Sequence, residues 1–158
     1  MKKFIYRAED VRDSLNTLRS EGIKKGAWTG FDSLFDKYSM KKGSTTYIYA
    51  GAHQGKSQFG FELMVNLAQY SGWKWAVYTP ETGSPTEVFA ELLWVYLRKP
   101  FLVNDKVMAT DEEKEEAMSF INEHFFLVDS GLQALSIEGF YTAVETIEED
   151  NFITIDGC

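Results

Sequence analysis

The chain has 158 residues, of which 44% are hydrophobic and 15% aromatic, enough for one packed domain and too few for two. Its 24 acidic and 16 basic side chains give a net charge of −8, which excludes the strongly basic surface of an independent nucleic-acid-binding domain. The one cysteine, Cys158, and the two histidines, His53 and His124, offer neither a disulfide framework nor a zinc-binding spacing. No apolar run approaches the roughly 20 residues that cross a bilayer. We therefore expect a soluble, cytoplasmic protein that does not enter a membrane.

The first predicted element is an amphipathic helix over residues 8–20. Val11, Leu15 and Leu18 recur at helical spacing among charged residues, and Gly22 ends the helix. Two roles are open for its apolar stripe, namely packing on the core of its own chain or packing on a neighbouring subunit. The sequence predicts two parts: this helix within residues 1–24, and an α/β part over residues 25–158.

Strands and helices alternate through the rest of the chain. The strands are predicted at residues 44–50, 74–79, 125–129 and 152–156, and the helices at 57–70, 86–97, 111–124 and 136–149. Thr110 is the expected N-cap of the 111–124 helix. Strands that alternate with helices of about 10–15 residues predict a mostly parallel sheet with helices on both faces. The apolar last strand is typical of the middle of a domain, so we expect an incomplete core.

The loop after the first predicted strand carries the clearest chemical signal. It reads Ala50, Gly51, Ala52, His53, Gln54, Gly55, Lys56, Ser57. A phosphate-binding loop needs inward-pointing backbone N–H groups, glycine where side chains would collide, a lysine for the outer phosphates and a hydroxyl for Mg²⁺. Gly55, Lys56 and Ser57 supply the last three of these. Ala50 stands where the usual pattern has glycine, Gly51 beside it provides the flexible backbone, and His53 is expected to face solvent.

Two carboxylates follow predicted strands. Glu81 comes after the second strand and Asp156 ends the fourth. Ligands of an open α/β sheet bind beyond the carboxyl ends of its strands, so both acids are predicted at the edge that carries the loop. Glu81 and Lys56 are the candidate catalytic residues, Glu81 positioning or deprotonating the attacking water, while Ser57 and Asp156 are the candidates for holding Mg²⁺. Capping a turn is the alternative role of each acid, and Asp129 is an alternative metal residue.

A Thr-Gly-Phe element precedes the first predicted strand, with Thr29, Gly30 and Phe31 followed by Leu34. This element, the loop at residues 50–57, and the acids Glu81 and Asp156 occur in an order that resembles the ATPase core of the RecA-type replicative DNA helicases. The resemblance is to the DnaB- and Twinkle-like group, especially its phage-encoded members, and it covers about residues 27–156. In that group the phosphate loop begins with alanine or glycine, a glutamate follows the second strand, and an aspartate ends a later apolar strand.

The resemblance implies a P-loop NTPase of RecA-like fold, with ATP and Mg²⁺ as cofactors. It implies ATP hydrolysis coupled to movement along single-stranded DNA and to duplex unwinding, in a homo-oligomeric ring of six subunits whose nucleotides lie between neighbours. An amino-terminal helix like that in residues 1–24 would be the linker that packs on an adjacent subunit, and a phage origin would place the protein in the host cytoplasm.

The family's sequence after the aspartate has no counterpart here, so the chain resembles the amino-terminal portion of that core. We expect it to bind Mg-ATP weakly and to hydrolyse little. Another RecA-like ATPase, such as a recombinase or a regulatory ATPase, and a nucleotide-binding module without turnover are the alternatives.

Overall fold

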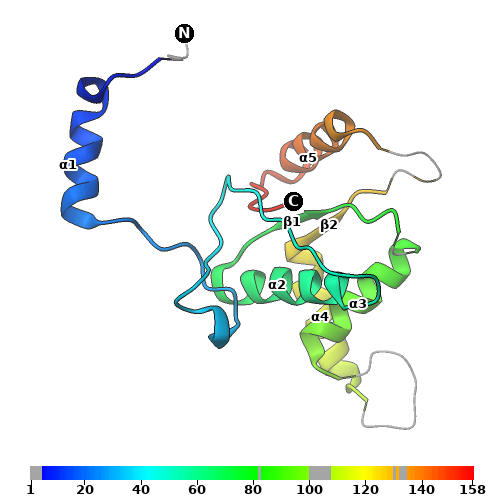
Figure 1. The fold of residues 1–158 in the computed structure, drawn as a ribbon. Helices are drawn as coiled ribbons and strands as arrows, with labels where there is room; N and C mark the ends of the chain where they lie inside the picture. Colours follow the sequence, from blue (N-terminus) through cyan, green and yellow to red (C-terminus); the bar gives the residue numbers. More distant parts are fainter. Residues whose placement is uncertain (1–4, 82, 100–107, 130, 132–134) are drawn as a thin grey trace.

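The computed structural model describes residues 5–81, 83–99, 108–129, 131 and 135–158 (Figure 1). The described elements are η1 (Ala8–Val11), α1 (Arg12–Glu21), η2 (Asp32–Leu34), α2 (Lys56–Ser71), β1 (Trp75–Val77), α3 (Pro85–Leu97), α4 (Asp111–His124), β2 (Phe125–Leu127) and α5 (Ile137–Asn151). Every predicted helix is confirmed, with ends that differ by a few residues at most. The first of them begins with the 3-10 turn η1 before it becomes α1.

Helix α4 spans the residues that the sequence predicts. Its start is fixed by side chains that cap the first turn. The Thr110 hydroxyl accepts a hydrogen bond from the Glu113 N–H at 3.2 Å, and the Glu113 carboxylate accepts one from the Thr110 N–H at 2.9 Å. This reciprocal pair is a capping box, which satisfies two backbone donors at the helix start. The ion pair with Lys99, together with the Thr110 N–H, lowers the pKa of the Glu113 carboxyl, so the cap is charged at neutral pH.

Replacing Thr110 with alanine should lower the free energy of unfolding by about 1 kcal/mol, because the Glu113 N–H loses its acceptor. The measurement is urea denaturation followed by circular dichroism at neutral pH. Thr142→Ala is the matched control, since Thr142 is an exposed residue inside α5 whose hydroxyl bonds only to the Glu138 carbonyl within the same helix. Equal losses in the two variants would show that the Thr110 cap contributes nothing.

The sheet is parallel but small. Strands β1 and β2 pair in the register Trp75 with Phe125 and Val77 with Leu127. On the other edge of β1 a single parallel bridge joins Trp75 to Gly157, with the Ala76 N–H donating to the Gly157 carbonyl at 3.0 Å. The described sheet region therefore runs in the order β2, β1, Gly157, which agrees with a mixed helix-and-strand fold and a parallel sheet.

Two predicted strands are wrong as strands. Residues 44–50 are extended but belong to no strand, and 41–49 are exposed, because strand hydrogen bonds need a neighbour and no described segment lies in register beside them. Residues 152–156 are not a strand either, since Phe152 ends α5 in a left-handed conformation with φ of 53°. The Ile153 N–H then returns to the Glu148 carbonyl, so ending the helix uses the residues that the prediction gave to the strand.

The core lies between β1 and the three helices α2, α3 and α4, and α5 lies on the opposite face of the sheet (Figure 1). The buried apolar cluster consists of Phe61, Leu63, Val65, Leu67, Ala68, Trp73, Trp75, Val77, Val88, Leu92, Leu93, Val95, Ala117, Ile121 and Phe125. Helix α5 buries only Val144 among its residues, so its face of the sheet is thinly covered. The prediction of helices on both faces is met in this reduced form.

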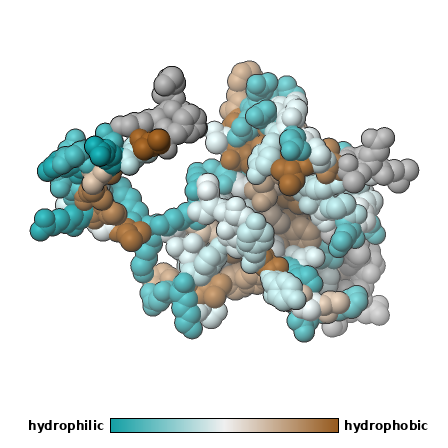
Figure 2. Space-filling model, turned by 45° about the horizontal axis from the view of Figure 1, so that its top comes forward, coloured by the Kyte–Doolittle hydropathy of each residue, from teal (hydrophilic) through white to brown (hydrophobic). Residues whose placement is uncertain are grey.

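Helix α1 stands beside the globular body and adds nothing to the buried cluster (Figure 1). Leu15 and Leu18 remain 48% and 47% exposed, and hydrophobic side chains are visible along this arm in Figure 2. Packing of the stripe on its own core is therefore not seen in this structure. None of the described helices is long and apolar enough to cross a membrane.

Candidate nucleotide site

The loop at residues 51–55 turns through two left-handed residues before α2 begins. His53 has a φ of 57° and Gly55, the residue that precedes α2, has a φ of 76°. The Phe59 N–H donates to the Gly55 carbonyl at 2.9 Å, so the helix ladder starts directly at the loop. The first N–H groups of a helix have no partner inside it and carry the positive end of the helix dipole. Residues 56–58 are thus placed to present N–H groups to an anion.

Lys56 closes this loop upon itself. Its Nζ donates to the Gly51 carbonyl at 2.8 Å, and the Gly51 N–H donates to Gln54 Oε1 at 2.9 Å. Both bonds are exposed to solvent, so water or a ligand oxygen can replace them at little cost. Ser57 lies exposed in the first helical turn beside the lysine, and His53 is exposed as the sequence predicts. The loop and the first turn of α2 therefore carry the Lys56 ammonium, the Ser57 hydroxyl and helix N–H groups. Phosphate recognition requires donors of these kinds.

The Thr-Gly-Phe element packs on the helix that follows the loop. Thr29 is fully buried and its carbonyl accepts a hydrogen bond from Asn66 Nδ2 at 3.2 Å. Gly30 has a φ of +81°, and a β-carbon added there would lie 2.4 Å from Asn66 Nδ2. Phe31 stacks on Phe59, with ring centroids 5.2 Å apart. The element thus fixes the segment before the loop against α2.

Asn66 and Arg98 are residues that sequence reasoning missed. Asn66 is 3% exposed, and Arg98 donates to its Oδ1 at 3.4 Å while forming an ion pair with Glu62. Arg98 ends α3 in a left-handed conformation with φ of 53°, unusual for a residue other than glycine. The contact holds the end of α3 on α2. In the sequence, this contact is indicated by Asn66, a polar residue on the otherwise apolar face of α2.

Glu81 lies in the exposed turn between β1 and α3, after the carboxyl end of the strand. Its predicted role toward a water molecule stays a prediction.

Asp156 lies at the other end of β1. Because Gly157 is opposite Trp75, Asp156 is level with Lys74, which precedes the strand. Its Oδ2 accepts a hydrogen bond from the Lys74 N–H at 3.0 Å, and its Oδ1 forms an ion pair with Lys42. The expectation that Glu81 and Asp156 share one edge is therefore not met in this structure, because backbone and lysine donors hold Asp156 at the start of the strand.

Asp129, the alternative metal residue, caps a turn. Its Oδ1 accepts a hydrogen bond from the Gly131 N–H at 2.9 Å. Within the described ranges no group of three or more His, Cys, Asp or Glu side chains is arranged to hold a metal ion. A Mg²⁺ ion at the loop would therefore take most of its ligands from phosphate oxygens and water, with Ser57 as the adjacent side chain, an arrangement that Mg²⁺ commonly adopts with nucleotides.

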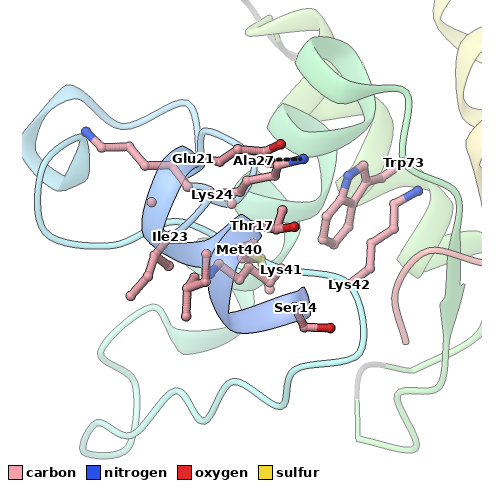
Figure 3. A pocket seen from close by; sticks show the side chains of 14 residues that line it. Ser14, Thr17, Glu21, Ile23, Lys24, Ala27, Met40, Lys41, Lys42 and Trp73 are labelled. Atoms are coloured by element: carbon pink, nitrogen blue, oxygen red, sulfur yellow. Dashed lines mark ion pairs between the residues drawn. The ribbon is translucent and has the colours of Figure 1, made fainter. Parts of the chain in front are cut away.

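A groove of about 570 Å³ lies away from the loop, between the end of α1 and the connector that follows it (Figure 3). Lys24, Lys41, Lys42, Met40 and Trp73 are among the residues that line it, and Lys24 is paired with Glu21. The residues that line this groove do not include any of 50–57. Residues 51–55 and Ser57 are exposed, so these groups of the candidate site face solvent.

Comparison with known proteins gives one informative similarity. No family model and no solved structure matches the chain. Over 137 residues, 83% of this chain, it is 27% identical to the Twinkle homolog protein, chloroplastic/mitochondrial, of Arabidopsis thaliana. The chain is similar to part of a Twinkle-type protein. It spans about a fifth of that relative, 19% of its length.

This similarity supports the coarser part of the sequence prediction, a relationship to Twinkle- and DnaB-like helicases.

Proposed function

We propose that residues 50–57 bind the phosphates of Mg-ATP, and that the chain is the nucleotide-binding part of an ATPase of the RecA-like replicative helicase type. The observation that carries this proposal is the placement of Lys56 and Ser57 at the start of α2, after a loop with left-handed His53 and Gly55. A phosphate that binds at the loop replaces the Gly51 carbonyl as the partner of Lys56. It also accepts hydrogen bonds from the N–H groups of the first turn of α2.

The proposed roles follow the order of the chain. Lys56 neutralises the outer phosphates, and Ser57 supplies a hydroxyl next to Mg²⁺. Glu81 orients or deprotonates the water that attacks the terminal phosphate. Asp156 would reach the metal only after it leaves Lys42 and the Lys74 N–H, so its metal role requires a rearrangement of the segment around Gly157.

The similarity to a Twinkle homolog supports the helicase type. By that analogy we propose that the complete ATPase is a homo-oligomeric ring, with six subunits and nucleotide between neighbours, that moves along single-stranded DNA and separates duplexes. The net charge of −8 argues that DNA contact is local or shared between subunits rather than spread over this chain.

The 158-residue chain should bind Mg-ATP weakly and release phosphate at a rate close to background. The reason is that Asp156 is held by Lys42, away from the loop, so the metal and water are incompletely oriented. Steady-state phosphate release, measured with the wild type and with Glu81→Gln, checks this. A rate well above background that Glu81→Gln removes would contradict the prediction of low turnover and at the same time support the role of Glu81.

A nucleotide-binding module without turnover is the second candidate. The ion pair between Asp156 and Lys42 favours this candidate, because Asp156 then has a structural role and does not hold a metal ion for hydrolysis. Binding of Mg-ATP with no phosphate release under any condition, including added single-stranded DNA, would support this candidate.

The helicase type is tested with the longest polypeptide that contains residues 1–158, given forked DNA and ATP. We expect strand separation and an ATPase rate that rises with single-stranded DNA. Failure of both, with nucleotide binding intact, would leave another RecA-like ATPase as the better assignment.

A further inference from the structure

Two hydrogen bonds tie the loop before α2 to Gly51. The Gly51 N–H donates to Gln54 Oε1 at 2.9 Å, and Lys56 Nζ donates to the Gly51 carbonyl at 2.8 Å. A β-carbon added at Gly51 would lie 3.2 Å from the same Gln54 oxygen, so the glutamine side chain lies directly over this residue. A side-chain oxygen of the loop therefore occupies one of the loop's own backbone donors.

The contact between Gln54 and Gly51 belongs to the turn of the loop. The two residues are three positions apart, and His53 between them has a φ of 57°, a left-handed conformation that is uncommon outside glycine. Gly55, directly after Gln54, is left-handed as well, with a φ of 76°. The contact is therefore local to the turn that leads into α2, and no other element is needed to form it.

An amide oxygen and a phosphate oxygen are acceptors for the same donor. A loop that binds phosphate does so with its backbone N–H groups, and each N–H has one proton to donate. Phosphate oxygens are charged and accept stronger hydrogen bonds than the neutral oxygen of glutamine. Residues 51–55 are exposed, so the Gln54 side chain can turn out into water when a phosphate arrives. Phosphate binding then costs the chain one existing hydrogen bond.

We propose that the Gln54 side chain competes with phosphate for the Gly51 N–H and thereby lowers the affinity of the loop for Mg-ATP. This inference rests on the proposed function of residues 50–57 and adds a residue that sets the affinity of the same site. Gln54 acts through Gly51 and is therefore a positioning residue, which holds the donor until a phosphate oxygen takes its place. Because an exposed hydrogen bond contributes little, removal of the competitor should tighten binding about two- to fivefold.

Isothermal titration calorimetry with Mg-ATP tests the proposal in the whole chain. Gln54→Met keeps the length of the side chain and removes the acceptor, so it should bind about two- to fivefold tighter than the wild type. Gln54→Glu places a charged acceptor over Gly51 and repels phosphate, so it should bind at least about tenfold more weakly. Loss of fold cannot produce tighter binding, and the first variant therefore separates competition from a structural role.

Gln69 provides the matched controls, because it is an exposed glutamine in the last turn of α2, at the opposite end of the helix from the loop. Gln69→Met and Gln69→Glu repeat the same changes in polarity and charge, and both should bind Mg-ATP within about twofold of the wild type. Amide hydrogen exchange gives a second readout without nucleotide. The Gly51 amide should exchange with solvent faster in Gln54→Met than in the wild type.

Two outcomes would overturn the competition and leave the nucleotide site standing. One is a folded Gln54→Met variant that binds Mg-ATP no more tightly than the wild type, which would mean that the glutamine does not oppose phosphate. The other is an unchanged exchange rate of the Gly51 amide in that variant. Binding of Mg-ATP by neither the wild type nor any variant would instead overturn the proposed function of residues 50–57, and the competition with it.

Discussion

Lys56→Ala should weaken binding of Mg-ATP by roughly 10- to 100-fold, because a charge-assisted hydrogen bond to phosphate contributes about 1.5–3 kcal/mol. The unliganded fold should not change, since the only described partner of the Lys56 ammonium is the exposed Gly51 carbonyl. Isothermal titration calorimetry gives the affinity, and circular dichroism checks the fold.

Lys41→Ala is the control for this variant. Lys41 is an exposed lysine of the groove beside α1, on a different part of the surface from the loop. Its removal changes the net charge by the same amount and should leave the affinity for Mg-ATP within about twofold at moderate salt. If both variants lost affinity equally, binding would reflect overall charge rather than a phosphate loop.

Gly30→Ala should lower the free energy of unfolding by about 3 kcal/mol, from a left-handed backbone and a collision that packing cannot relieve easily. The added β-carbon would lie 2.4 Å from the Asn66 amide, which is itself buried and bonded to the Thr29 carbonyl. Urea denaturation of the purified variant measures the change. Affinity for Mg-ATP should also fall, because Asn66 and Lys56 both belong to α2, which begins directly after the loop.

Gly43→Ala separates backbone strain from collision. Gly43 has a φ of +74°, close to that of Gly30, and an added β-carbon would meet nothing within 4 Å. This variant should lose only about 1 kcal/mol, the cost of a left-handed alanine. Equal losses in the two variants would show that the contact between Gly30 and Asn66 has no energetic weight.

The helices were predictable because their signals are local. Apolar spacing and the residues that start a helix lie within a few positions of each other, as the Thr110 and Glu113 pair illustrates. The turn into α2 was predictable for the same reason, since Gly55, Lys56 and Ser57 are contiguous, and its phosphate-binding role stays a prediction. The predicted strand at 44–50 failed because a strand exists only with a neighbour, which local sequence does not specify. The predicted strand at 152–156 failed because Phe152 and Ile153 end α5, and only Asp156 and Gly157 reach the edge of β1.

The position of Asp156 depended on residues far away in sequence. Lys42 and the Lys74 N–H hold it at the start of β1, and nothing near Asp156 in sequence indicates either partner. The Thr-Gly-Phe element was recognised as a motif, but its function as the anchor on α2 became visible only through Asn66. Both contacts join segments that are distant in sequence and meet only in the fold. A local sequence pattern therefore could not predict them.

The most direct test of the nucleotide site is a titration of the ¹⁵N-labelled chain with Mg-ATP, followed by amide chemical shifts. The largest shifts should fall on residues 51–57, where N–H groups receive phosphate oxygens, and they should disappear in Lys56→Ala. Shifts absent from this loop, or concentrated on the lysines of the groove beside α1, would contradict the assignment of residues 50–57 as the phosphate-binding site.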